Sequence, residues 1–181
     1  MPRLTLKSEI EFAGVGLHSG KQTSVRLLPA KSGDGYGFEF DGRRYPIEAA
    51  GHSGDGRGTI LAFGSNQIMT VEHLLAALQG LGVDDVTICP CGEETPLLDG
   101  SSLDFCTGIL KTGLCENAGE PSIIRISTPV FAASSDERKF CAVFPSDKLS
   151  FTYVLEYGDN AIGTQIATVM PHPDSFVTEL G

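Results

Sequence analysis

The sequence has 181 residues, of which 41% are hydrophobic and 20% are charged, and this composition predicts a globular protein rather than a disordered one. Its formal net charge of −10 argues against binding to nucleic acid and against electrostatic adsorption on anionic membranes. No apolar run reaches the length of a membrane span, and the five cysteines lack a disulfide-framework spacing, so we expect a cytoplasmic protein without stable membrane insertion.

The first third of the chain is dominated by strand patterns. Alternating apolar residues predict a strand over Leu4–Phe12 and a returning strand over Gln22–Pro29. Between them, Gly14–Gly20 predicts a tight turn with close backbone approach, either as an ordinary hairpin loop or as part of a site. Further strands are predicted over Tyr36–Phe40 and Thr59–Phe63, with Asp-Gly turn signals between them.

An amphipathic helix is predicted over Val71–Leu81, because its apolar residues recur at offsets of three and four. Thr70 is the expected N-cap. Glu72 and His73 then fall in the first turn, where the helix macrodipole favours an ionised carboxylate and a neutral imidazole. A metal-activated hydrolase needs these protonation states, although the pair would also suit a capping carboxylate beside a surface or core histidine.

The chain then returns to a strand, predicted over Asp85–Cys89, and to a second helix over Leu103–Leu114 that Ser101 or Ser102 could cap. Asp99 precedes Gly100 in a turn signal, so it is either a turn former or a site residue.

A domain boundary is predicted over residues 113–122, which are rich in Gly, Asn, Glu and Pro. Four strand-like runs follow it, and they cover Ile123–Val130, Lys139–Phe144, Leu149–Tyr157 and Ile162–Met170.

These elements predict the α+β fold class. We expect a first domain, residues 1–116, in which two helices pack on one face of a mostly antiparallel sheet. We expect residues 122–181 to begin a second domain of similar architecture that ends before its own helices. Helix faces left uncovered in this way would form an exposed apolar patch and favour self-association.

Three motifs occur in an order that points to one family. They are Gly14-Val15-Gly16-Leu17-His18-Ser19-Gly20, Thr70-Val71-Glu72-His73-Leu74-Leu75-Ala76-Ala77-Leu78 and Pro96-Leu97-Leu98-Asp99-Gly100-Ser101. With them, the whole chain resembles the UDP-3-O-acyl-N-acetylglucosamine deacetylases, zinc-dependent amide hydrolases of lipid A biosynthesis. The resemblance implies hydrolysis of the N-acetyl amide of a UDP-linked acylated glucosamine to acetate and the free amine.

The resemblance also implies roles for individual residues. Glu72 would be the general base and His73 a zinc ligand. His18 would border the active site, Thr59 would contribute to acyl-chain contacts, and the ring of Tyr157 would pack on the uracil. Thr59 is equally expected in a core strand, so both readings of that residue stay open.

A catalytic zinc takes three protein ligands and keeps one position for water, but the predicted helix supplies only His73. Neither the H-E-x-x-H nor the H-x-x-E-H spacing is present. The resemblance implies that a further His and Asp ligand follow an Ala-Arg-Thr-Phe motif that this sequence does not contain. We therefore expect the N-terminal portion of such an enzyme, inactive as the isolated chain. The alternative is a catalytically inactive binding or scaffold module that keeps the fold.

Overall fold

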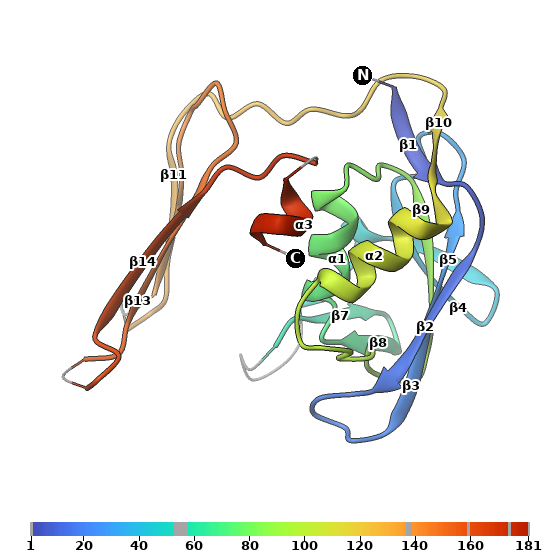
Figure 1. Cartoon of the computed structure of the whole chain (residues 1–181), viewed down its shortest axis with the longest axis horizontal. Helices are drawn as coiled ribbons and strands as arrows, with labels where there is room; N and C mark the ends of the chain where they lie inside the picture. Colours follow the sequence, from blue (N-terminus) through green and yellow to red (C-terminus); the bar gives the residue numbers. More distant parts are fainter. Residues whose placement is uncertain (1, 53–57, 137–138, 159, 174, 181) are drawn as a thin grey trace. The chain divides into compact units, whose positions relative to one another are not determined.

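The structure is a computed structural model that describes residues 2–52, 58–136, 139–158, 160–173 and 175–180 (Figure 1). It confirms the α+β class. The strands are β1 (Arg3–Leu6), β2 (Ile10–Val15), β3 (Gln22–Pro29), β4 (Tyr36–Phe40), β5 (Arg43–Pro46), β6 (Gly51–His52), β7 (Ile60–Phe63), β8 (Asn66–Met69), β9 (Val86–Cys91), β10 (Leu114–Asn117), β11 (Val130–Ala133), β12 (Phe140–Val143), β13 (Phe151–Glu156) and β14 (Thr164–Val169). The α-helices are α1 (Glu72–Gly80), α2 (Leu103–Thr112) and α3 (Phe176–Glu179).

The chain divides into two compact units. The first contains Met1–Pro121 together with His172–Gly181, and the second contains Ser122–Pro171. In the first unit the ring of Phe176 in α3 lies so close to Gly80 of α1 that a β-carbon on that glycine would lie 2.5 Å from it. The C-terminal segment therefore groups with the first unit, whereas the domain ranges 1–116 and 122–181 stay a prediction.

A five-stranded sheet in the order β2-β3-β9-β4-β5 forms the framework of the first unit. Its neighbours are antiparallel except for the parallel pair β4–β9. Strand β3 alternates buried and more exposed residues, which places Val25 and Leu27 on the face toward the core. Smaller sheets, β6-β7-β8 and β1-β10, complete the unit.

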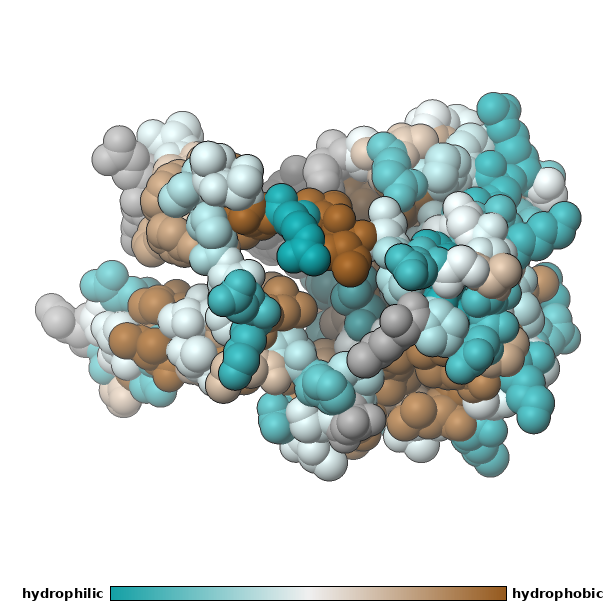
Figure 2. Space-filling view, turned by 90° about the horizontal axis from the view of Figure 1, so that it is seen from above, coloured by the Kyte–Doolittle hydropathy of each residue, from teal (hydrophilic) through white to brown (hydrophobic). Residues whose placement is uncertain are grey.

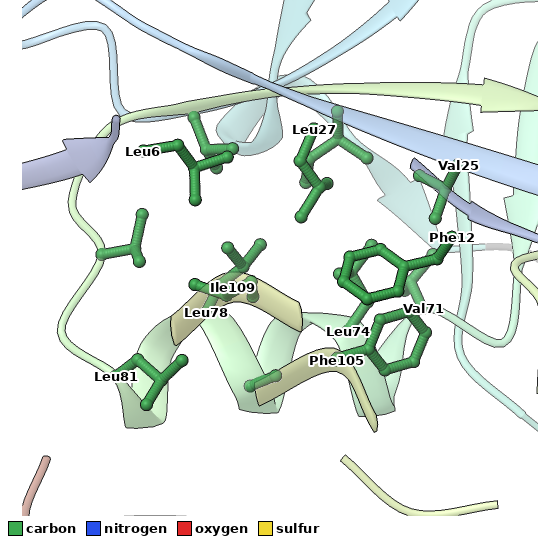
Figure 3. Packing of buried hydrophobic residues seen from close by; sticks show 14 of the residues in the cluster. Leu6, Phe12, Val25, Leu27, Val71, Leu74, Leu78, Leu81, Phe105 and Ile109 are labelled. Atoms are coloured by element: carbon green, nitrogen blue, oxygen red, sulfur yellow. The ribbon is translucent and has the colours of Figure 1, made fainter. Parts of the chain in front are cut away.

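Helices α1 and α2 cover one face of this sheet (Figure 1). Their buried side chains point toward those of the strands in Figure 3. The labelled core residues are Leu6, Phe12, Val25, Leu27, Val71, Leu74, Leu78, Leu81, Phe105 and Ile109, and each is at most 8% exposed. The period that predicted the first helix thus marks the side chains that hold it on the sheet.

Three predicted elements differ from the structure. The predicted strand Leu4–Phe12 is two strands in different sheets, because β1 pairs with β10 and β2 pairs with β3. The second helix ends at Thr112, since Gly113 adopts a left-handed φ of 88° and Leu114 begins β10. The predicted strand Ile123–Val130 is wrong: the strand begins only at Val130, after a proline that has no N–H to donate to a ladder.

The second unit consists of two hairpins, β11-β12 and β13-β14. It carries most of the exposed large hydrophobic residues, and Figure 2 shows apolar side chains on the molecular surface. They include Val130, Phe131, Phe140, Phe144, Leu149, Phe151, Tyr153, Val154, Ile162, Ile166 and Met170. On the helices that cover the sheet, α2 exposes Leu103 and Leu110. The expected apolar surface therefore lies mainly on strands rather than on helix faces, and self-association stays a prediction.

In the described part of the chain, no helix combines the length and the apolar character needed to cross a membrane.

Candidate functional site

The predicted site residues Glu72 and His73 lie at the start of α1, and both are half-buried. The helix begins at Glu72, with Val71 at the N-cap position. Thr70 is therefore not the N-cap, and that prediction was wrong. Its backbone has a φ of 59°, in the left-handed region that a β-branched residue rarely adopts. A conformation of this kind costs on the order of 1–3 kcal/mol and persists only where the surroundings enforce it.

Hydrogen bonds from three directions hold Thr70 in this conformation. Its amide donates to the carbonyl oxygen of Thr59 at 2.9 Å, and its carbonyl oxygen accepts a bond from the hydroxyl of Thr95. Its own hydroxyl, which would have capped the helix, donates instead to Glu94 Oε1 at 2.8 Å. The half-buried Thr59 thus contacts the entry to α1 through its backbone.

Glu94 is a buried carboxylate, with 1% of its surface exposed. Besides the Thr70 hydroxyl, it accepts bonds from the amide of His18 at 3.0 Å and from the amide of Ser19 at 2.8 Å. Burial alone would raise the pKa of Glu94, but the bonds from His18, Ser19 and Thr70 lower it to about 2. An ionised carboxylate therefore joins the glycine-rich loop to the residue that precedes the helix.

The ends of the His18 and Glu72 side chains both lie close to Gly58. A β-carbon placed on Gly58 would lie 3.5 Å from His18 Nε2 and 4.0 Å from Glu72 Oε1. The structure thus brings together two residues that are 54 positions apart in the sequence.

The other carboxylate oxygen, Glu72 Oε2, is buried, and no hydrogen-bond donor reaches it from the part of the chain that the structure describes. Buried polar atoms in folded proteins almost always have a partner, so an atom of this kind points to an ion, a water or a substrate group.

Asp99 is exposed and forms a local turn. It accepts bonds at 2.9 Å from the amide and from the hydroxyl of Ser101. These bonds lower the pKa of Asp99, and the charge of His73 contributes to the same effect. The turn interpretation of Asp99 is therefore supported.

The donor types at the start of α1 suit zinc in part. An imidazole is a standard zinc ligand, and a carboxylate oxygen without a donor can serve as a base beside it. A group of three or more His, Cys, Asp or Glu side chains that could hold a metal is not found in the described ranges of residues 2–180. The described residues therefore fit one ligand and the neighbouring base, and not a full set of three.

Tyr157 belongs to the second unit. It is 52% exposed, and its amide donates to the carbonyl oxygen of Gly163 at 3.2 Å. Its predicted contact with the uracil stays a prediction.

Sequence reasoning did not single out Glu94. In the sequence it stands next to Glu93, and only the structure distinguishes the buried Glu94 from the exposed Glu93. The one usable signal was indirect: a tight, glycine-rich loop leaves amides that need an acceptor, and a nearby carboxylate can supply it.

Comparison with known proteins gives one consistent result. The family model described as UDP-3-O-acyl N-acetylglycosamine deacetylase matches residues 3–181. The chain is 38% identical over 182 residues to the UDP-3-O-acyl-N-acetylglucosamine deacetylase of Chlamydia pneumoniae, an alignment that covers 97% of this chain and 64% of that protein. The enzymes of the same name from Chlamydia caviae and Chlamydia trachomatis serovar D are 38% and 36% identical, with 64% and 62% of their lengths covered. The chain thus spans just under two thirds of the length of these relatives.

Proposed function

The chain belongs to the UDP-3-O-acyl N-acetylglycosamine deacetylase family, and on this premise we propose that it forms part of a cytoplasmic enzyme of lipid A biosynthesis. Its reaction is the hydrolysis of the N-acetyl amide of UDP-3-O-acyl-N-acetylglucosamine to acetate and the free amine. The observation that carries this proposal is Glu72 Oε2, which lies next to His73 in the first turn of α1, is buried, and meets no hydrogen-bond donor from the described residues.

Each side chain at the start of α1 has a role in this reaction. His73 supplies one imidazole ligand to zinc, and the remaining ligands come from outside the described residues. When bound there, zinc would supply a water of lowered pKa and would polarise the amide carbonyl. Glu72 takes the proton from the attacking water, since no described residue donates a competing hydrogen bond to its Oε2.

The other predicted residues act on the substrate. His18 reaches the point that Glu72 also faces, so we assign it a contact with the reacting end of the sugar. Thr59 lies beside the helix entry and contributes to the acyl-chain side, and Tyr157 provides an aromatic surface for the uracil.

An inactive scaffold module is a weaker account of this chain. A buried carboxylate oxygen without a partner costs stability, and a protein without chemistry has no use for it.

Acetate release from UDP-3-O-acyl-N-acetylglucosamine tests the proposal in protein made from the complete coding sequence. Glu72→Gln removes the base and keeps the shape, so we expect turnover to fall roughly 10²- to 10⁴-fold. Glu93→Gln, at an exposed glutamate nearby, is the control and should behave as wild type. Wild-type turnover in Glu72→Gln would rule out the proposed base.

A further inference from the structure

The segment that carries Glu94 is fixed at its backbone on two sides. The amide of Met69 donates to the carbonyl oxygen of Glu93 at 2.9 Å. The amide of Thr95 donates to the carbonyl oxygen of Met69 at 3.1 Å. The hydroxyl of Thr23 donates to the carbonyl oxygen of Glu94 itself. The Glu94 side chain therefore projects from a backbone segment that is held on both sides.

One oxygen of Glu94 joins two segments that are distant in the sequence. Oε1 accepts both the amide of His18 and the hydroxyl of Thr70, while Oε2 accepts the amide of Ser19. The His18 segment belongs to the glycine-rich loop between β2 and β3, and Thr70 lies two positions before Glu72, the first residue of α1. A single carboxylate thus sets the distance between the loop and the helix entry.

The loop itself is shaped around this carboxylate. A β-carbon on the buried Gly16 would clash with Glu94 Oε2 and would lie 2.8 Å from Glu94 Cδ and 2.5 Å from Ser19 Oγ. Close approach is the reason for glycine at this position. Gly20 closes the loop with a φ of 62° and donates its amide to the carbonyl oxygen of Gly16 at 3.0 Å.

We propose that Glu94 is a positioning residue, whose buried carboxylate fixes the His18 loop against Thr70 and so sets His18 beside Glu72. The expected effect on turnover rests on the proposed function. The clamp, by which we mean the hydrogen bonds from His18, Ser19 and Thr70 to the Glu94 carboxylate, can be tested without activity. Glu94 reaches the reacting atoms only through His18 and through the entry to α1.

The chemistry of the three donors requires a carboxylate here. His18 and Ser19 present N–H groups and Thr70 presents an O–H group, so the site needs acceptors only. A glutamine of the same size would turn its NH₂ group toward at least one of these donors and leave it unsatisfied.

Backbone hydrogen exchange tests the clamp directly. In Glu94→Gln we expect the amides of His18 and Ser19 to exchange roughly ten- to a hundredfold faster, since hydrogen bonds to charged acceptors are the stronger ones. The amides of Gly33 and Gly35, which donate to the buried Asp85, should be unchanged. Asp85→Asn is the matched control, because it converts the other buried carboxylate to its amide. It should speed exchange at Gly33 and Gly35 and leave exchange at His18 and Ser19 unchanged.

Steady-state kinetics test the consequence. We expect kcat to fall roughly ten- to a hundredfold in Glu94→Gln with a smaller change in KM, because a misplaced group near the reaction affects the transition state more than substrate binding. Gly16→Ala disturbs the contact between the loop and Glu94 from the loop side, so it should also lower kcat more than it changes KM. Folded Asp85→Asn should keep wild-type kcat, so a fall in kcat confined to Glu94→Gln and Gly16→Ala would not follow from a general loss of stability.

The outcomes separate the two proposals. Unchanged exchange at His18 and Ser19 in both Glu94→Gln and Gly16→Ala would overturn the clamp. Faster exchange with wild-type kcat would overturn the positioning role. If the wild-type protein releases no acetate, the proposed function fails, and the exchange measurement still decides whether Glu94 holds the loop.

Discussion

Two buried carboxylates flank strand β9, and their surroundings differ. Asp85, just before the strand, is fully buried and paired with Arg3 at 2.7 Å. It also accepts the amides of Gly33 and Gly35, so the region around it is satisfied. Glu94, just after the strand, is held by two amides and a hydroxyl, all neutral donors.

The neighbourhood of Glu94 also contains features that reduce stability. Thr70 has a strained backbone, and Glu72 Oε2 has no donor within the described ranges of the chain. Such features persist in proteins mainly at functional sites. The Asp85 region therefore maintains the fold, whereas Glu94, as we propose, holds in place a strained site in which Glu72 Oε2 has no donor among the described residues.

The largest effect on stability is expected at Asp85, whose carboxylate is ion-paired and hydrogen-bonded. Asp85→Asn breaks a buried ion pair and leaves Arg3 without its partner, so we expect the free energy of unfolding to fall by about 3–5 kcal/mol. Urea unfolding followed by circular dichroism measures this change. A loss below about 1 kcal/mol would show that the Asp85 region is not the stabilising one.

A smaller effect of opposite sign is expected at the site. Glu72→Met removes a buried oxygen that receives no hydrogen bond from the described residues, and it keeps an unbranched side chain of similar size. We therefore expect the free energy of unfolding to rise by about 1–3 kcal/mol while activity is lost. Glu94→Met is the matched control, and it should lower stability because it strands three donors. A large loss of stability in Glu72→Met would show that Glu72 stabilises the fold, as Asp85 does, and would contradict the difference between the two regions.

The third effect concerns pH. Hydrogen bonds hold the pKa of Asp85 and of Glu94 at about 2, although burial alone would raise both. Their ordinary values are 3.8 and 4.5. Because the folded pKa values are lowered, both groups stabilise the fold above the ordinary values, and this contribution is lost as the pH falls from about 4.5 to about 2.

Thermal unfolding between pH 5 and pH 2 should show this decline in the wild type. Asp85→Asn and Glu94→Gln should each make this decline less steep, because each removes a group that takes up to about one proton on unfolding. Equal pH dependence in all three proteins would show that neither carboxylate is held ionised by the fold.

The sequence predicted some of these features and missed others for identifiable reasons. The apolar stripe of α1 predicted the helix and the face it buries, because periodicity reflects a local surface. The strained Thr70 and the buried Glu94 depend on contacts with Thr59, Thr95 and the His18 loop, and no local pattern reports such contacts. Thr70 was assigned as a cap because its type favours caps, yet tertiary contacts took its hydroxyl.

We propose that His73 holds zinc beside the base Glu72, and a measurement of zinc content tests this proposal. The measurement compares wild type, His73→Ala and Asp85→Asn, each made from the complete coding sequence, by elemental analysis after removal of free metal. We expect stoichiometric zinc in the wild type and in folded Asp85→Asn, and its loss in folded His73→Ala. Retention of stoichiometric zinc in His73→Ala, or a wild-type protein that binds none, would contradict it.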